Sequence, residues 1–148
     1  MRSKPDAILF DMDGTLTNVN AIRHHVQFGN TNFTKFHEES VDCPPNQWVV
    51  DAAVEGKLAG FEIVVVTARR AEFRHHTAMW LALNGVPSDA MFMRHDRDQR
   101  GDVFVKRDIL NRIRLSWNPV HAFDDNPKVV ALWREEGIPV TVVPGWSG

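Results

Sequence analysis

Short runs of apolar residues alternate along the chain with segments whose apolar residues recur every three or four positions. Runs of this length that end in polar residues are typical of strands buried in a parallel sheet. Four strong runs and one weaker run have this character: 7–10, 62–66, 120–123 and 140–143, with the weaker one at 90–93. We expect these five segments to be strands.

The segments between these runs have helical periodicity, and they cover 46–60, 69–85, 102–115 and 126–137. Asn46, Asp102 and Asn126 stand where an N-cap side chain is favoured. Gly85 and Gly137 follow the last apolar positions, where a helix commonly stops. Alternating strands and helices predict an α/β fold in which a central parallel sheet has helices on both faces.

Two segments, 18–45 and 94–101, have little periodicity of either kind. Each of them follows the end of a predicted strand. In open parallel sheets the functional residues gather beyond the carboxyl ends of the strands. Either segment can therefore border a functional site.

The length is that of a single domain, which we expect to cover residues 1–148. The net charge of −2 argues against nucleic-acid binding through overall charge and leaves only a local basic cluster for that purpose. Cys43 is the only cysteine, which excludes an intrachain disulfide and fits a reducing compartment. No apolar run approaches the roughly 18 residues of a membrane span, and the N-terminus lacks a secretory apolar stretch. We expect a cytoplasmic protein without a membrane partner.

Polar residues follow three of the predicted strands directly. They are Asp11 and Asp13 after the first, Thr67, Arg69 and Arg70 after the second, and Asp124 and Asp125 after the run at 120–123. Parallel strands bring these positions to one edge of the sheet, where carboxylates that approach closely repel one another. A divalent cation removes this repulsion, and ligands that are all oxygen favour Mg²⁺.

A calcium loop or a plain turn is the alternative reading of the first acidic pair. An EF-hand loop needs Gly at its sixth position and Glu at its twelfth. Counted from Asp11, these positions hold Leu16 and Ile22, so the calcium loop is excluded. A plain turn explains Gly14, but it does not explain a second acidic pair at another strand end.

The combination of motifs resembles the haloacid dehalogenase superfamily of phosphotransferases. The stretch DMDGT from Asp11 matches its first motif, Thr67 at the end of VVVTAR matches the second, Lys106 matches the third, and FDDN matches the acidic fourth. The resemblance implies a three-layer Rossmann-like fold. Members often carry a cap domain over the site, but the 28 residues of 18–45 are too few for a large one.

The resemblance also implies a role for each motif residue. Asp11 is the expected nucleophile, and Asp13 is the expected acid/base. Thr67 and Lys106 are expected to stabilise the phosphoryl group and the charge around it. The expected Mg²⁺ ligands are Asp11, the backbone carbonyl of Asp13, and Asp124, with Asp125 bound through water or supporting the other ligands.

Residues 69–110 and 123–146 are further similar to the 3′-phosphatase domain of phage polynucleotide kinases. The loop at 94–101 has a local excess of arginine, and Arg94, Arg97 and Arg100 join Arg69 as candidate residues for binding substrate phosphates. The alternative for this loop is a solvated segment with internal Arg–Asp pairs.

The resemblance implies a Mg²⁺-dependent phosphomonoesterase that acts on a nucleic-acid 3′ end or on a nucleotide. A small-molecule phosphatase and a non-catalytic protein that binds phosphate remain as alternatives. The chain contains no Gly-x4-Gly-Lys-Ser/Thr loop, which a kinase would need. We therefore expect a phosphatase that works alone or beside a separate kinase or ligase.

Overall fold

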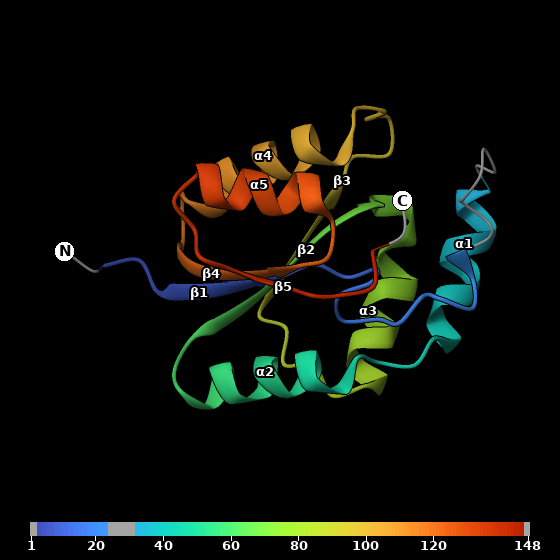
Figure 1. Cartoon of the computed structure of the whole chain (residues 1–148), viewed down its shortest axis with the longest axis horizontal. Coiled ribbons are helices and arrows are strands. Elements are labelled where there is room, and N and C mark those ends of the chain that lie inside the picture. Colours follow the sequence, from blue (N-terminus) through green and yellow to red (C-terminus); the bar gives the residue numbers. More distant parts are fainter. Residues whose placement is uncertain (1–2, 24–31, 147–148) are drawn as a thin grey trace.

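The computed structural model describes residues 3–23 and 32–146, which form a five-stranded sheet between two layers of helices (Figure 1). The strands are β1 Asp6–Phe10, β2 Glu62–Arg70, β3 Ala90–Arg94, β4 Asn118–Asp124 and β5 Val140–Val142. Their order in the sheet is β3-β2-β1-β4-β5, and all neighbouring strands are parallel. The predicted α/β fold is confirmed.

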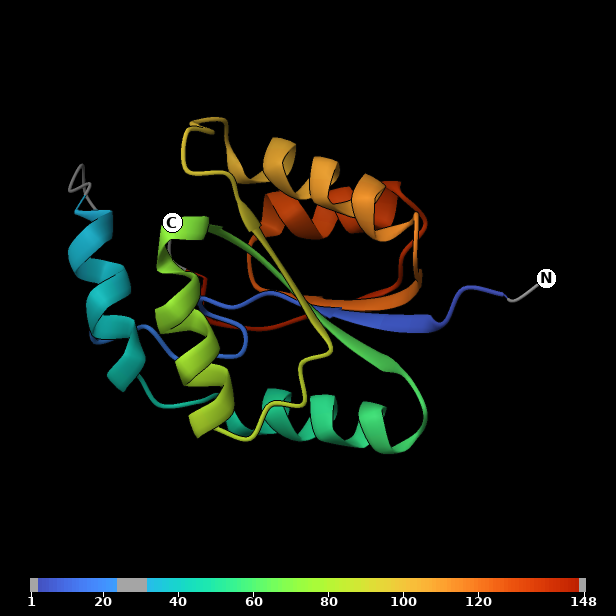
Figure 2. The same cartoon turned by 180° about the vertical axis from the view of Figure 1, so that it is seen from behind.

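The helices cover both faces of the sheet, as the reverse view in Figure 2 also shows. They are α1 Phe33–Glu39, α2 Gln47–Leu58, α3 Arg74–Leu83, α4 Asp102–Ile113 and α5 Pro127–Glu135, with 3-10 turns η2 Ser40–Asp42 and η3 Ala71–Phe73. The pair α4 and α5 lies on one face, and α2 and α3 lie on the other. No helix in the described part of the chain is long and apolar enough to cross a membrane.

Alternate residues of each central strand pack into two separate cores. Leu9 of β1 and Val64 of β2 belong to the core under α4 and α5. Phe10 and Val65, one position later in each strand, belong to the core that includes residues of α2 and α3. Burial on both faces explains why these strands read as continuous apolar runs in the sequence.

The strand register brings the residue that follows β1 next to the last residue of β4. Phe10 lies level with Val65 and with Phe123 in the two neighbouring strands. The backbone N–H of Asp11 donates to the Phe123 carbonyl at 3.0 Å. Asp11 and Asp124 therefore stand side by side at the carboxyl edge of the sheet.

The helix expected over 69–85 begins later than its sequence pattern indicates. Arg69 and Arg70 are the last residues of β2, because the strand resumes its pairing at Arg70, opposite Arg94, after an irregularity beyond Val66. The chain then passes through η3 and enters α3 at Arg74. The prediction that the helix starts at Arg69 was wrong, and the strand carries Arg69 to the edge of the site.

The segment 18–45 contains an element that its pattern does not predict. Helix α1 is only seven residues long, and Asn32 caps it by accepting from the Lys35 N–H at 3.1 Å. In both views α1 stands beside α3, beyond the carboxyl ends of the strands. The described part of this segment therefore borders the carboxyl edge of the sheet, as its place in the sequence predicted.

Only one of the three predicted N-cap side chains performs that role. Asn126 accepts from the Lys128 N–H at 3.0 Å at the start of α5. Asn46 occupies the N-cap position of α2, but its side chain donates to the Thr15 carbonyl at 2.9 Å. Helix α4 already includes Asp102, and Gly101 is its N-cap. Asn46 thus ties α2 to the loop after β1 instead of closing its own helix.

Candidate active site

The loop after β1 carries Asp11, Asp13 and Thr15 and turns sharply at Gly14. Gly14 has a φ of 81°, a conformation that residues with a Cβ rarely adopt. Its N–H donates to the Thr17 carbonyl at 2.9 Å. The turn brings Thr15 Oγ1 to 3.0 Å from Asp11 Oδ2, so the side chain of Asp11 is held in place from within its own loop.

Lys106 of α4 lies between the carboxylates of two strands. Its Nζ donates to Asp11 Oδ1 at 2.7 Å and to Asp124 Oδ2 at 2.9 Å. Only 2% of Lys106 is exposed. A buried ammonium needs carboxylate partners to offset its desolvation, and here two of them face it.

Asp11, Asp124 and Asp125 form a cluster whose ligand oxygens all lie within 4.8 Å of one another. All three residues are buried. With Lys106 charged, three carboxylates and one ammonium carry a formal charge of −2 in this small volume. The magnitude of this charge is that of one divalent cation.

One carboxylate oxygen of Asp125 also indicates that this cluster binds a cation. Its Oδ2 is buried and has no hydrogen-bond partner among the described residues. Asp124, in contrast, has hydrogen-bond partners on both oxygens: its Oδ1 accepts from the Asn126 N–H at 3.1 Å, which leaves a lone pair for a metal ion, and its Oδ2 accepts from Lys106 and from Trp133 Nε1. An unpaired buried carboxylate oxygen is costly unless a cation binds it. The residues present therefore fit a hard divalent metal ion.

The pKa values of the cluster reflect this excess of negative charge. Burial, with a further contribution from Asp124, raises the pKa of Asp11 well above its usual 3.8. Burial and Asp124 likewise raise the pKa of Asp125. Burial alone would lower the pKa of Lys106, but Asp11 and Asp124 outweigh it and raise that pKa. In both Asp11 and Asp125, burial and the Asp124 carboxylate disfavour the ionised form more than the Lys106 ammonium favours it, so both pKa values rise.

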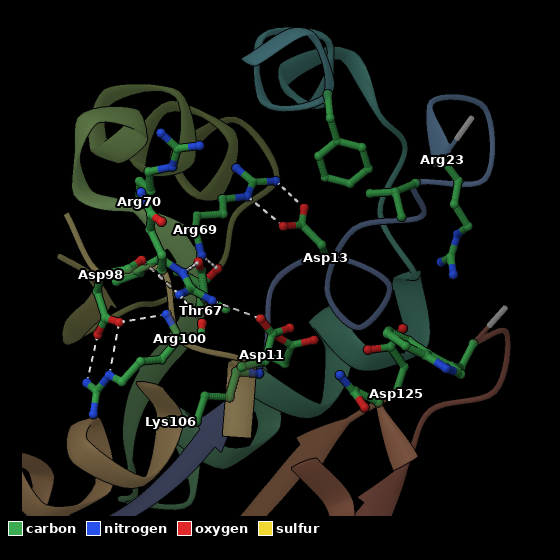
Figure 3. A pocket seen from close by; sticks show the side chains of 18 of the residues that line it. Asp11, Asp13, Arg23, Thr67, Arg69, Arg70, Asp98, Arg100, Lys106 and Asp125 are labelled. Carbon is green, nitrogen blue, oxygen red and sulfur yellow. Dashed lines mark hydrogen bonds and ion pairs between the residues drawn. The ribbon is translucent and has the colours of Figure 1, made fainter. Parts of the chain in front are cut away.

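Asp13 belongs to a separate charge pair at the other side of the loop. Arg69 Nε donates to Asp13 Oδ2 at 2.8 Å, and Arg69 Nη2 donates to Asp13 Oδ1 (Figure 3). The backbone N–H of Arg69 also donates to Thr67 Oγ1 at 3.1 Å. Arg69, predicted to bind substrate, is thus bound to the predicted acid/base through two parallel hydrogen bonds, the strongest arrangement for such a pair.

A cavity of about 600 Å³ opens over these groups. Asp11, Asp13, Thr67, Lys106 and Asp125 all contribute to its lining. The same lining contains a basic and an apolar set of residues: Arg23, Arg69, Arg70, Arg94 and Arg100, and Val19, Phe36 and Trp146. Asp96, Asp98 and Asp102 also line the cavity, so its arginines stand among carboxylates.

The three arginines expected from the loop at 94–101 are placed differently from one another. Arg94 lines the cavity, but it also donates to the Ala68 carbonyl at 2.8 Å and pairs with Asp102 at 3.0 Å. Arg100 lines the cavity and pairs with Asp98 and Asp108. Arg97 is exposed and does not contribute to the lining of this cavity. Two of the three side chains thus organise the loop itself.

Three further residues contribute to the site, although the sequence assigned none of them a role there. Thr15 contacts Asp11, and Arg70 and Arg23 line the cavity. Thr15 lies within the first motif, and Arg70 follows the second, so both could have been found from position alone. Arg23 lies in the segment without periodicity, and Figure 3 shows its side chain directed toward the region of Asp125. No local pattern marked it.

Comparison with solved structures places the fold among known phosphatases. Two structures of the Pnkp1/Rnl/Hen1 complex match 95% of this chain at 25% identity with a TM-score of 0.81. This chain spans only 46% and 42% of the matched chains, less than half of their length. A class C acid phosphatase from Bacillus anthracis with tungstate bound has the same fold, with 14% identity, a TM-score of 0.73, and coverage of 97% of this chain and 68% of that one.

Fold and site together define a phosphatase of the haloacid dehalogenase type, a hydrolase that acts on phosphate esters. Residues 5–145 match the family described as the polynucleotide kinase PNKP phosphatase domain. The chain belongs to this family.

Proposed function

We propose that this chain is a Mg²⁺-dependent phosphomonoesterase that removes the 3′-phosphate from polynucleotide ends through an aspartyl-phosphate. The observation that carries the proposal is the buried cluster of Asp11, Asp124, Asp125 and Lys106 at the floor of the cavity. Its negative charge, and an Asp125 Oδ2 that has no hydrogen-bond partner among the described residues, fit one divalent ion. Asp13 stands beside this cluster in the same cavity, as a separate proton-carrying group.

In the first half of the reaction, a carboxylate oxygen of Asp11 attacks phosphorus and forms a P–O bond. The bond from phosphorus to the 3′ oxygen breaks, and Asp13 gives a proton to the departing alkoxide. Thr67, buried next to the strand end, donates a hydrogen bond to the phosphoryl oxygens. Lys106 holds Asp11 in position and offsets the charge that gathers there.

In the second half, Asp13 accepts a proton from a water molecule as that water attacks phosphorus. The bond from phosphorus to Asp11 breaks, inorganic phosphate leaves, and both carboxyl groups return to their starting state. Asp11, Asp124, Asp125 and the Asp13 carbonyl would hold the ion. Bound Mg²⁺ supplies a positive charge that screens the carboxylates from the phosphoryl group they must approach.

The lining of the cavity supports a polynucleotide end as the substrate. The lining combines arginines with the apolar side chains of Val19 and Phe36, which suits a phosphate group attached to a nucleoside. Arg23 and Arg70 add positive charge to the lining, which favours the binding of phosphates. The family match and the neighbour described as the Pnkp1/Rnl/Hen1 RNA repair complex agree with this choice.

The same neighbour supports a proposal about partners and location. Because that neighbour is described as an RNA repair complex, we propose that this chain acts beside a kinase or ligase in end repair. We also propose a cytoplasmic location, because its only cysteine, Cys43, is buried as a free thiol.

Phosphate release from three substrates tests the function. A 3′-phosphorylated oligonucleotide, the matching 5′-phosphorylated one and a 3′-mononucleotide are each incubated with Mg²⁺ or with EDTA. Rapid, Mg²⁺-dependent release from the 3′-phosphorylated oligonucleotide alone supports end repair, and equal kcat/KM on the mononucleotide would assign a small-molecule phosphatase instead. Release that Asp11→Asn leaves unchanged would overturn the mechanism.

A further inference from the structure

We propose that Thr77 is a positioning residue for Asp13. Its hydroxyl fixes the guanidinium of Arg69, and Arg69 in turn fixes both carboxylate oxygens of Asp13. The inference rests on the proposed role of Asp13 as proton carrier, and it assigns a function to a helix residue outside the phosphatase motifs.

The contacts form an unbroken chain from helix to loop. Arg69 uses Nε and Nη2 for Asp13, and its remaining Nη1 donates to Thr77 Oγ1 at 2.9 Å. Thr77 Oγ1 donates to the Phe73 carbonyl at 3.0 Å. A hydroxyl has a single proton, so donation to Phe73 turns its lone pairs toward Arg69. Each bond in this chain therefore has one defined direction.

Burial makes this chain rigid. Thr77 is fully buried, and only 2% of Arg69 is exposed. Water cannot easily replace a lost partner at such a depth, so removing the hydroxyl leaves a buried guanidinium N–H unsatisfied. The guanidinium would then shift to find another acceptor, and Asp13 would move with it.

Helix α3 holds Thr77 in a fixed place relative to the strands. Trp80 and Leu81, which follow one turn later on the same face of the helix, are buried in the core that contains Phe10 and Val65. Trp80 Nε1 also donates to the Cys43 carbonyl at 2.8 Å. Thr77 is thereby fixed against the strand from which the Asp13 loop emerges.

A fixed carboxyl group matters most for proton transfer. Asp13 has to face the leaving oxygen in one step and water in the next, and its side chain is 24% exposed. Without the Arg69 fork such a side chain would sample several rotamers. A small displacement slows proton transfer while substrate binding and Asp11 attack remain intact.

The test compares two substrates that differ in their need for a proton. One is an oligonucleotide with a 3′-phosphate. The other is the same oligonucleotide with sulfur in place of the bridging 3′ oxygen, whose thiolate leaves without protonation. Thr77→Val should lower kcat/KM for the oxygen substrate about tenfold or more and change the sulfur substrate by less than about twofold. Thr77→Ser should restore the oxygen reaction.

Two further variants give controls. Thr141→Val removes the hydroxyl of a residue in β5, an edge strand, where Thr141 contacts His121 of β4, and should leave both substrates unaffected. In an Arg69→Lys background, Thr77→Val should add no further loss, because it acts through Arg69. If Thr77→Val does not fold, Thr77→Ala takes its place.

Asp13→Asn separates failure of the inference from failure of the proposed mechanism. It should slow the oxygen substrate far more than the sulfur substrate. Equal slowing of both by Asp13→Asn would overturn the proton-carrying role itself. If Asp13→Asn is selective but Thr77→Val slows both substrates equally, or neither, then Thr77 has only a structural role and the inference is wrong.

Discussion

Gly14 and Asp125 approach so closely that a Cβ on Gly14 would lie 2.0 Å from Asp125 Oδ2. This is the same oxygen that has no partner among the described residues. The first motif thus needs glycine here for two reasons, the positive φ of its backbone and the space that Asp125 occupies. Gly14 of the first motif therefore leaves the space that Asp125 of the fourth motif occupies.

Gly14→Ala should therefore displace Asp125 and weaken metal binding. We expect activity at low Mg²⁺ to fall by about tenfold or more, with partial recovery at high Mg²⁺. Gly60→Ala is the matched control, because Gly60 also has a positive φ but nothing lies within 4 Å of its added Cβ. Titration of activity against Mg²⁺ checks both. An unchanged Mg²⁺ requirement in Gly14→Ala would remove Asp125 from the proposed metal site.

Lys106→Met should abolish activity and destabilise the metal-free protein. It leaves Asp11 and Asp124 buried without their shared ammonium, which costs about 3–5 kcal/mol when a buried pair is broken. Mg²⁺ should recover more of the free energy of unfolding in this variant than in the wild type. Urea unfolding with EDTA and with Mg²⁺ measures this difference.

Lys57→Met provides the matched comparison for that experiment. Lys57 also contacts two carboxylates, Glu62 at 2.9 Å and Asp89 at 2.8 Å, but its side chain is 41% exposed. Solvent screens such pairs, so only a small loss of stability and no loss of activity is expected. Similar losses in the two variants would show that burial of the Lys106 cluster has no special energetic role.

The stability of the metal-free protein should fall as pH rises above about 4, the ordinary range of an aspartate. Burial and Asp124 raise the pKa of Asp11 in the folded state, so its contribution is complete at low pH and is lost as pH passes through the raised pKa. Mg²⁺ binds the ionised form and should reverse this decline. Urea unfolding across pH, with and without Mg²⁺, measures the effect, and Asp11→Asn should reduce it. If the free energy of unfolding depends on pH in the same way in Asp11→Asn and in the wild type, Asp11 does not cause the decline.

The sequence predicted the parts of this molecule that depend on strand order and strand ends. Asp11, Thr67 and Asp124 were expected at one edge because parallel strands place their carboxyl ends together, and the register of β1, β2 and β4 does so. Lys106 was expected from the resemblance, and its helix carries it into the same cluster. Periodicity and motif spacing are local signals, and they suffice for these residues.

Contacts between residues far apart in the sequence could not be predicted from these local signals. Arg69 pairs with Asp13, which lies 56 positions earlier in the sequence, and no local pattern identifies that partner. The alternative of internal Arg–Asp pairs in the loop at 94–101 was stated from the sequence, and Arg100 does pair with Asp98. Its second partner, Asp108 of α4, lies outside the loop and was not predicted. Short α1 was missed because seven residues do not establish a helical period.

Arg70 and Arg97 should differ in which substrates they affect. Arg70 lines the cavity, so Arg70→Ala should raise KM several-fold both for a 3′-mononucleotide and for a 3′-phosphorylated oligonucleotide. Arg97 is exposed and lies outside the cavity lining, where only a longer strand can reach it. Arg97→Ala should therefore raise KM for the oligonucleotide alone.

The salt dependence of kcat/KM gives a second readout for the same pair. Loss of one phosphate contact reduces the slope of log kcat/KM against log salt by about 1. We expect this reduction for Arg97→Ala with an oligonucleotide and none with the mononucleotide. If Arg97→Ala leaves both KM and the salt slope unchanged on the oligonucleotide, Arg97 does not contact substrate. The basic character of that loop then serves its internal ion pairs, as Arg100 already illustrates with Asp98 and Asp108.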